Sequence, residues 1–177
     1  MTTVQTHFSL FSLPVVFDID LVELTNRYRD LQKAVHPDKF ANSSEQERLK
    51  AIQRASQVND GYAVLKSPLS RAQYLLELNG VKSDDNATIS DPFFLMQQME
   101  MRESLEEASL KEDALAAVED SLDEIDNVYR ALLNEIKRMF AEANPDYHAI
   151  NNNVLKLHFF NRLKNEAETL LANIENK

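Results

Sequence analysis

The apolar residues between positions 112 and 143 recur at alternating spacings of three and four residues without a break. This spacing keeps one stripe of an α-helix facing its neighbours along the whole segment. It therefore predicts a long bundle helix with a coiled-coil-like seam. The seam consists of Leu115, Val118, Leu122, Ile125, Tyr129, Leu132, Ile136 and Met139.

The glycine content also favours a helical chain, with two glycines among 177 residues. Sheet folds need more glycine for their turns, so we expect an all-α protein. Cysteine is absent, which excludes disulfides, thiolate metal sites and cysteine nucleophiles. No run of about 18 apolar residues occurs, so we expect no transmembrane helix.

The charge of the chain argues against nucleic-acid binding, since the net charge is −10 and the isoelectric point is near 4.9. The charge is also unevenly distributed. Residues 26–39 carry four Lys or Arg against two Asp, whereas residues 84–126 carry fourteen Asp or Glu against two basic residues. This asymmetry indicates two different partners. The N-terminal segment lacks the features of a signal or transit peptide, so we expect a cytoplasmic protein.

Two long helices are predicted in the first 80 residues. The first runs over 20–36, with Asp18 or Asp20 as its N-cap, and ends before Pro37. Its expected core stripe is Leu21, Leu24, Tyr28, Leu31 and Val35, with Arg29, Lys33 and His36 on the opposite side.

The second long helix begins after Ser43 or Ser44, with Glu47 as the capping-box partner. Gly61 interrupts it at a cost of about 1 kcal/mol relative to alanine. Its expected core stripe is Leu49, Ile52, Ala55, Val58, Tyr62 and Leu65. Short helices at 8–12 and after Pro68 flank the resulting antiparallel hairpin, and Asn79-Gly80 forms a C-terminal cap.

Residues 81–91 form the only polar stretch long enough for a linker. Asp91-Pro92 then opens a helix, the seam helix follows, and a last helix spans 146–176. Three helices joined by short breaks predict an antiparallel bundle. Within the pair Phe159-Phe160, adjacent helical positions point about 100° apart, so we expect one ring at the bundle edge.

The helix that opens at Pro92 has more apolar surface than one core stripe needs. A core face is expected from Phe94, Met101, Leu105 and Ala108. A second face interleaves apolar residues with acids, namely Leu95, Met96, Met99, Glu100, Glu103 and Glu107. This second face either packs against the N-terminal domain or binds a basic, partly apolar partner.

The sequence His36-Pro37-Asp38-Lys39 joins the two hairpin helices. It is either simple helix punctuation or a contact site held out on the hairpin. As an acid–base pair, His36 and Asp38 have no evident cleft or partner nucleophile. The four histidines show no i, i+4 pairing with one another. We therefore assign no catalytic residue, no metal ligand and no cofactor.

The segment "HPDKF" between a basic and an amphipathic helix, followed by "VNDGYAVLKSPLSRAQY", resembles the J-domain, the module that stimulates the ATPase of DnaK-type chaperones. In chain order, "FSLFSLP", "DLQKAVHPDKFA", "RAQYLLELNG" and "FLMQQMEMRESLEE" resemble the HscB-type co-chaperones of bacterial iron–sulfur cluster assembly. The resemblance covers nearly the whole chain and is weakest in the linker and in the seam helix.

The resemblance implies a J-domain over 1–80, a linker over 81–91 and a scaffold-binding three-helix bundle over 92–177. It implies that His36, Pro37 and Asp38 contact a DnaK-type (HscA-like) chaperone, with Arg29 and Lys33 as supporting cations. It implies binding of an IscU-like iron–sulfur cluster scaffold protein through Leu95, Met96, Met99, Glu100, Glu103, Glu107 and Phe159. The protein would then be no enzyme but an adaptor between the two partners.

Two alternatives stay open: a J-domain co-chaperone for a different client, and an adaptor without any chaperone link, which would leave the His-Pro-Asp motif unexplained. The sequence departs from the J-domain pattern at Asn59-Asp60-Gly61, where we expect an effect on stability more than on contact. The N-terminal cysteine-rich metal site of animal members is absent, which favours a bacterial protein.

Overall fold

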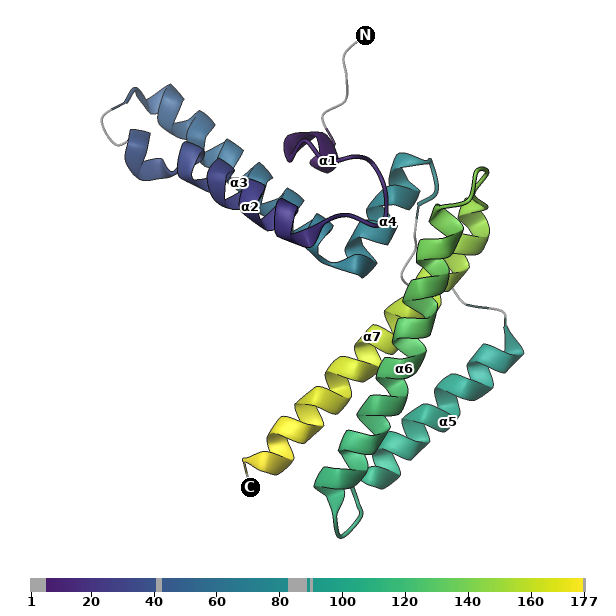
Figure 1. The fold of residues 1–177 in the computed structure, drawn as a ribbon. Coiled ribbons are helices and arrows are strands. Elements are labelled where there is room, and N and C mark those ends of the chain that lie inside the picture. The colour runs from purple at the N-terminus through teal and green to yellow at the C-terminus, as the bar shows by residue number, and fades with distance from the viewer. Residues whose placement is uncertain (1–5, 41–42, 83–88, 90, 177) are drawn as a thin grey trace. The chain divides into compact units, whose positions relative to one another are not determined.

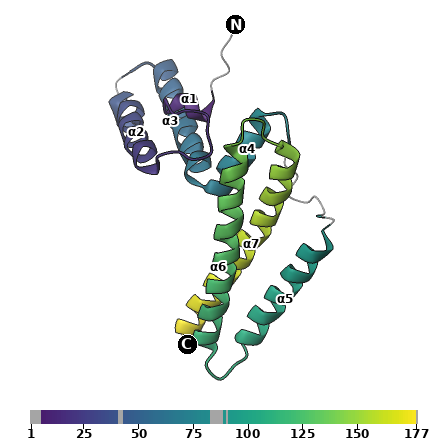
Figure 2. The same ribbon diagram turned by 45° about the vertical axis from the view of Figure 1, so that its right-hand side comes forward.

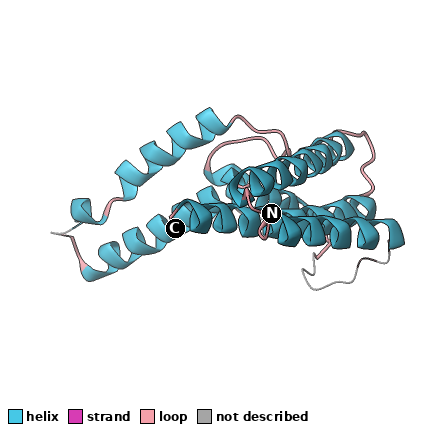
Figure 3. Cartoon of the chain, turned by 90° about the horizontal axis from the view of Figure 1, so that it is seen from below, coloured by secondary structure: helices cyan, strands magenta, loops and turns pink. Residues whose placement is uncertain are grey.

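The computed structural model describes residues 6–40, 43–82, 89 and 91–176. Within these ranges the chain consists of helices and connecting turns, with no strand (Figure 3). The expected all-α fold class is therefore confirmed. The helices pack into two units, Met1–Leu75 and Leu76–Lys177. No helix in the described ranges has the length and apolarity needed to cross a membrane.

The first unit is built on the hairpin of α2 (Leu21–Val35) and α3 (Glu45–Lys66), seen in Figure 1. The short helix α1 (His7–Leu10) and the 3-10 helix η1 (Pro37–Phe40) both pack against α3. Helix α4 (Pro68–Leu78) follows and crosses the boundary between the two units. The predicted hairpin with short flanking helices is confirmed.

Side-chain caps fix where the two hairpin helices begin. The carboxylate of Asp20 accepts hydrogen bonds from the backbone N–H groups of Val22 at 2.8 Å and Glu23 at 3.0 Å. Ser44 and Glu47 form the reciprocal capping box of α3. Of the two candidates predicted for each cap, the structure selects Asp20 and Ser44. Each cap satisfies backbone donors that the helix itself leaves without partners.

Gly61 has a packing reason that the sequence did not reveal. It is buried in the last third of α3, and a Cβ atom there would lie 3.1 Å from His7 Nδ1 and 3.2 Å from the Phe11 ring. The missing side chain lets α1 and its following turn approach α3 closely. The cost of a glycine within a helix is thus offset by the packing of α1.

The expected apolar stripe of α3 is correct only in its later turns. Val58 and Leu65 are fully buried, but Leu49 is 56% exposed and Ile52 is 49% exposed. Helix α1 reaches α3 at Gly61, farther along the helix, and so does not cover these first turns. Leu21, expected in the core stripe of α2, is likewise exposed.

Gly80, two residues after the end of α4, has a backbone conformation that favours glycine. Gly80 has a φ of +81°, which side chains disfavour. The N–H of Val81 donates to the carbonyl of Leu76 at 2.9 Å, and that of Gly80 donates to Glu77 at 3.0 Å. These bonds satisfy the last carbonyls of α4, so the predicted C-terminal cap at Asn79-Gly80 is confirmed.

The second unit contains a bundle of α5 (Pro92–Ala108), α6 (Ala114–Phe140) and α7 (Tyr147–Glu175) (Figures 1 and 2). Helix α6 packs along α7, and α5 packs against both. The seam helix is shorter than the predicted 112–143, because Asp113 caps its start and Ala141 ends it.

The bundle core follows the predicted faces of its helices in most positions. Leu115, expected at the start of the seam of α6, is instead 38% exposed. Phe94, Leu105 and Ala108 of α5 are buried as expected, whereas Met101 is only half-buried. On α7, Phe160 is buried and Phe159 is half-buried, as predicted for adjacent positions. The buried cluster consists of Phe94, Leu105, Ala108, Val118, Ile125, Phe160, Leu163 and Ala167.

Candidate functional site

The first candidate site lies where α2 ends. His36 has φ −59° and ψ 128°, an extended conformation that the following proline favours. The chain then enters η1, where the N–H of Lys39 donates to the carbonyl of His36 at 3.0 Å. The backbone of Pro37 and Asp38 belongs to η1, but their side chains lie outside what the structure describes.

Three of the predicted contact residues are brought together at this helix end. A shallow, open hollow of about 550 Å³ is lined by Arg29, Gln32, Lys33, His36 and Lys39. Sequence reasoning did not assign Gln32 or Lys39 to the site. Both could have been found from their positions. Gln32 lies three residues after Arg29 and four before His36, so it shares their side of the helix, and Lys39 extends the His-Pro-Asp motif. The hollow carries three Lys or Arg side chains and therefore suits an acidic partner.

Lys33, one of the cations of this surface, is only weakly paired within the unit. Lys33 Nζ lies 3.9 Å from the Asp30 carboxylate, with side-chain exposures of 78% and 80%. An ion pair so exposed holds its partners weakly. Lys33 can therefore turn toward an acidic partner with little loss of internal stability.

The contact between α2 and α3 positions the hollow. Gln32 Nε2 donates to Tyr28 Oη at 2.6 Å and to Asn59 Oδ1 at 3.0 Å, and the Tyr28 hydroxyl donates to Asn59 Oδ1 at 3.2 Å. The rings of Tyr28 and Tyr62 stack at a centroid distance of 3.9 Å. Asn59, which departs from the J-domain pattern, thus holds Gln32 in place from the facing helix.

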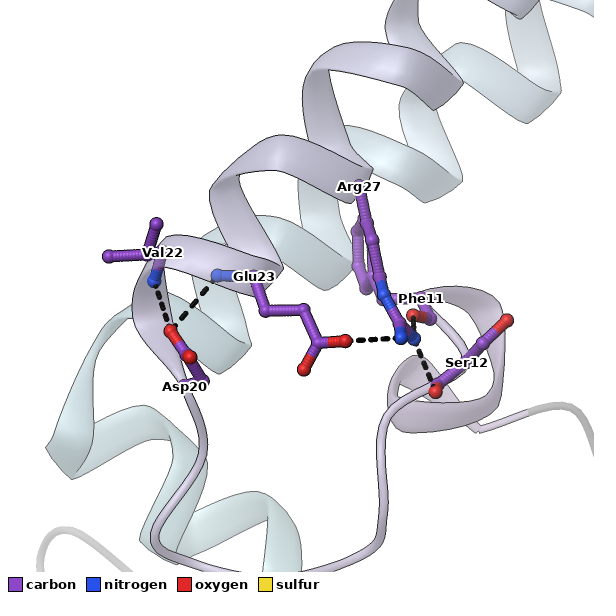
Figure 4. Close-up of polar contacts among 6 residues, drawn as sticks. All are labelled: Phe11, Ser12, Asp20, Val22, Glu23 and Arg27. Atoms are coloured by element: carbon purple, nitrogen blue, oxygen red, sulfur yellow. Dashed lines mark hydrogen bonds and ion pairs between the residues drawn. The ribbon is translucent and has the colours of Figure 1, made fainter.

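Arg27 has a different role from the other cations of residues 26–39. Its guanidinium donates to the backbone carbonyls of Phe11 and Ser12 and pairs with the Glu23 carboxylate (Figure 4). These bonds fasten the turn after α1 to the middle of α2. Arg27 is therefore a structural residue, although the charge pattern alone did not separate it from its neighbours.

The second candidate site is the outward face of α5. Leu95, Met96 and Met99 are 37%, 61% and 59% exposed, so they contribute little to the bundle core. The three predicted glutamates on the same face, Glu100, Glu103 and Glu107, are exposed as well. We call these six residues the α5 face. Its apolar side chains bordered by acids are typical of a protein-binding surface.

Phe159 lies deeper than the α5 face. Its ring meets the Phe94 ring edge-on at 5.8 Å and the Phe160 ring at 5.3 Å. The Phe94 and Phe160 rings are also edge-on, at 5.9 Å. Edge-to-face aromatic contacts are worth about 0.5–1.5 kcal/mol each beyond their buried area. Phe159 is thus a half-buried member of the aromatic cluster under the start of α5.

Polar contacts fasten α5 to α7. The Asp91 carboxylate accepts from the backbone N–H of Phe94 at 3.2 Å and from Lys156 Nζ at 2.6 Å. The hydrogen bond from Lys156 holds the pKa of Asp91 below its ordinary value, with a smaller contribution from the N–H of Phe94. Farther along, Arg102 pairs with Glu166 at 3.5 Å. The helix that carries the α5 face is therefore attached to α7 by two ion pairs, one near its start and one farther along.

Phe93 is a candidate residue that sequence reasoning missed. It is 78% exposed, whereas its neighbour Phe94 is 3% exposed. The signal was present in the sequence, because two adjacent aromatic residues of a helix point about 100° apart and cannot both enter one core.

Comparisons with known proteins place this chain among characterised relatives. Residues 90–168 match the family model described as the HSCB C-terminal oligomerisation domain. A co-chaperone protein HscB homolog from Vibrio vulnificus (strain YJ016) is 44% identical over 163 residues, which cover 92% of this chain and 94% of the relative. The chaperone HscB from Vibrio cholerae superposes with a TM-score of 0.87 at 39% identity, covering 96% and 99% of the two chains. The human co-chaperone HscB superposes with a TM-score of 0.87 at 27% identity, covering 96% and 83%.

Proposed function

Because this chain belongs to the HscB family of J-type co-chaperones of iron–sulfur cluster assembly, we propose that it stimulates the ATPase of a specialised DnaK-type (HscA-like) chaperone and delivers an IscU-like scaffold protein to it. Residues 1–80 act as the J-domain, 81–91 as the linker and 92–177 as the scaffold-binding part. The protein works in the bacterial cytoplasm as an adaptor and catalyses no reaction itself.

The proposed chaperone contact is supported mainly by the cluster of cations around one hollow beside the His-Pro-Asp motif. Arg29, Lys33 and His36 line this hollow together with Lys39. An acidic chaperone surface would be attracted to it over a distance of about 10 Å at 0.1 M salt. Such steering raises the association rate more than the final affinity. His36, Pro37 and Asp38 then make the close contact at the helix end.

The α5 face supports binding of the scaffold protein. Leu95, Met96 and Met99 offer exposed apolar area, and methionine adapts its shape to a partner. The three glutamates select a partner with basic groups around an apolar patch. Phe159 completes the surface from α7. Holding both partners on one chain raises the concentration of the scaffold protein at the chaperone without any new contact.

The first test is the steady-state ATPase rate of a purified HscA-like chaperone with this protein added. His36→Gln should abolish the stimulation without unfolding the chain, because His36 is exposed at a helix end. His148→Gln is the matched control, since His148 is an exposed histidine in the first turn of α7. Stimulation by His36→Gln at the wild-type level would refute the docking role of the motif.

The second test is titration calorimetry against a purified IscU-like scaffold protein. The triple variant Leu95→Ala/Met96→Ala/Met99→Ala should lose the binding that the wild-type protein shows. Leu110→Ala/Leu115→Ala removes other exposed apolar side chains of the same unit and should bind normally. If the wild-type protein stimulates the chaperone but does not bind the scaffold protein, the alternative of a different client is favoured.

A further inference from the structure

Phe93 is a large aromatic side chain on the surface of α5, 78% exposed. Single exposed apolar residues are common on protein surfaces and need no explanation. Phe93 differs because it does not stand alone. It continues a surface that already contains Leu95, Met96 and Met99, and a larger apolar patch bordered by charge indicates an interface.

Helical geometry places Phe93 beside two residues of the α5 face. It precedes Met96 by three positions and Glu100 by seven, so it lies about 60° and about 20° from them around the helix axis. Leu95 lies at the other edge of the face, on the side of Arg102, which pairs with Glu166 of α7. Phe93 therefore extends the α5 face at the edge away from that ion pair and toward the start of the helix.

The backbone that carries Phe93 is held in place before any partner binds. Pro92 occupies the first helical turn, and Asp91 both caps the helix and bonds to Lys156. Phe94, the next residue, packs edge-on against the rings of Phe159 and Phe160. A rigid aromatic side chain loses little conformational entropy on binding, and aromatic residues are enriched among those that dominate binding energies.

We infer that Phe93 is a further apolar anchor for the scaffold protein, the fourth on α5 beside Leu95, Met96 and Met99. It would insert into an apolar pocket of the scaffold protein whose basic border meets Glu100. This inference rests on the proposed function, because it takes the scaffold protein as the partner of the α5 face. It extends the contact from Leu95 toward the start of α5, where Phe93 is the second helical residue. We assign this partner for two reasons: Phe93 is continuous with the α5 face, and the basic groups of the partner would have the opposite charge to the glutamates of that face.

The test is calorimetry of Phe93→Ala and Phe93→Leu against the scaffold protein. We expect Phe93→Ala to raise the dissociation constant about tenfold, within the range of an interface anchor. Phe93→Leu should lie between Phe93→Ala and the wild type, because it keeps part of the apolar area. Leu110→Ala, which removes an exposed apolar side chain beyond the end of α5, should bind as the wild type does.

Two further readouts separate an anchor from a structural residue. Phe93→Ala should leave the thermal unfolding midpoint and the ATPase stimulation measured without scaffold protein unchanged. In a double-mutant cycle, Phe93→Ala and Met96→Ala should weaken binding non-additively, since the two side chains are neighbours that share one pocket.

The outcomes distinguish the inference from the function on which it rests. If the α5 triple variant loses binding but Phe93→Ala binds as the wild type does, the anchor role of Phe93 is overturned and the proposed function stands. If Phe93→Ala changes only the self-association of the chain, the surface serves a second copy and the inference is wrong. If the wild-type protein does not bind the scaffold protein, both the function and the inference fail.

Discussion

The cationic hollow at the end of α2 and the apolar face of α5 are supported in different ways. The hollow is lined by long polar side chains, of which Gln32 is held by a hydrogen bond to Asn59 of α3. The α5 face stands above an aromatic cluster that includes Phe94 and Phe160. The hollow therefore depends on charge, whereas the α5 face depends on the packed aromatic cluster of Phe94, Phe159 and Phe160 beneath it, which we call the platform.

This difference predicts how each surface binds. Attraction between charges acts at a distance, weakens with salt and tolerates mobile side chains. Apolar contact acts at short range and requires that both surfaces keep their shape. The proposed adaptor would thus bind its chaperone through a fast electrostatic contact, and its client through an apolar contact between surfaces of complementary shape. The following changes should affect one surface and spare the other.

The largest effect is expected when the platform is removed. Phe160→Ala deletes a ring that is 1% exposed and edge-on to both Phe94 and Phe159. Such a change lowers the free energy of unfolding by about 3–5 kcal/mol. Denaturant unfolding followed by circular dichroism measures this loss. Scaffold binding should fall with it, whereas ATPase stimulation without scaffold protein should persist.

Phe93→Ala is the matched control for this prediction, since it removes the same kind of side chain from the surface. It should leave the free energy of unfolding near the wild-type value. Equal unfolding curves for Phe93→Ala and Phe160→Ala would show that the aromatic cluster does not support α5 as described.

A smaller effect is expected at the hollow. Arg29→Ala/Lys33→Ala should weaken the apparent affinity for the chaperone about tenfold at low salt, which corresponds to about 1.4 kcal/mol. Most of the loss should disappear at high salt, where the wild-type attraction is itself screened. ATPase stimulation titrated at two salt concentrations measures both effects. Lys111→Ala/Arg162→Ala gives the same change in net charge on the other unit and should stimulate normally.

A reversal of charge on the α5 face should have a still smaller effect. Glu100→Lys/Glu103→Lys should weaken scaffold binding about fivefold, since exposed ion pairs contribute about 0.2–1 kcal/mol each. The loss should appear mainly in the association rate, which stopped-flow or surface-based kinetics can resolve. Glu119→Lys/Glu124→Lys on α6 is the control of equal charge. Normal binding by the α5 variant would mean that the glutamates do not select the partner.

Local signals in the sequence located most of the helix ends and several of the helix faces. Each of the two caps was narrowed to two candidates, which included Asp20 and Ser44, because a cap involves residues only two or three positions apart. Helix periodicity grouped the residues of the α5 face, but it left open whether this face is packed or exposed; the exposure of Leu95, Met96 and Met99 comes from the structure. The wheel failed for Leu49 and Ile52, because it gives the direction of a side chain but not the length over which a neighbouring helix covers it.

Contacts between distant parts of the chain were not predictable. Gly61 was interpreted as a cost, since nothing in the sequence shows that α1 approaches α3 at that point. The bond between Gln32 and Asn59 is equally invisible from spacing. Asp91 illustrates both cases: its cap was predicted, but its bond to Lys156, which lies 65 positions away, was not.

The bond between Asp91 and Lys156 gives the smallest predicted effect and the most local test of the α5 platform. Because Lys156 holds the pKa of Asp91 below its ordinary value of 3.8, this bond stabilises the folded chain fully above that value. The stabilisation is lost as the pH falls through the lowered pKa of the folded state. Asp91→Asn keeps a capping side chain but removes the ion pair. Its deficit in the unfolding midpoint should therefore be present at neutral pH and should shrink below pH 3.8.

Lys156→Met provides the converse variant, because it removes the ammonium group, which also lies 5.5 Å from the centre of the Phe94 ring, and keeps an unbranched apolar side chain. In this variant the pKa of Asp91, measured by NMR titration of its carboxyl carbon, should rise toward the ordinary value. Since the bond fastens the first turn of α5 to α7, scaffold binding should weaken slightly in both variants, while chaperone stimulation stays unchanged. An unshifted carboxyl titration in Lys156→Met would show that the bond does not hold the start of α5, and that the rigidity of the platform comes from the aromatic cluster alone.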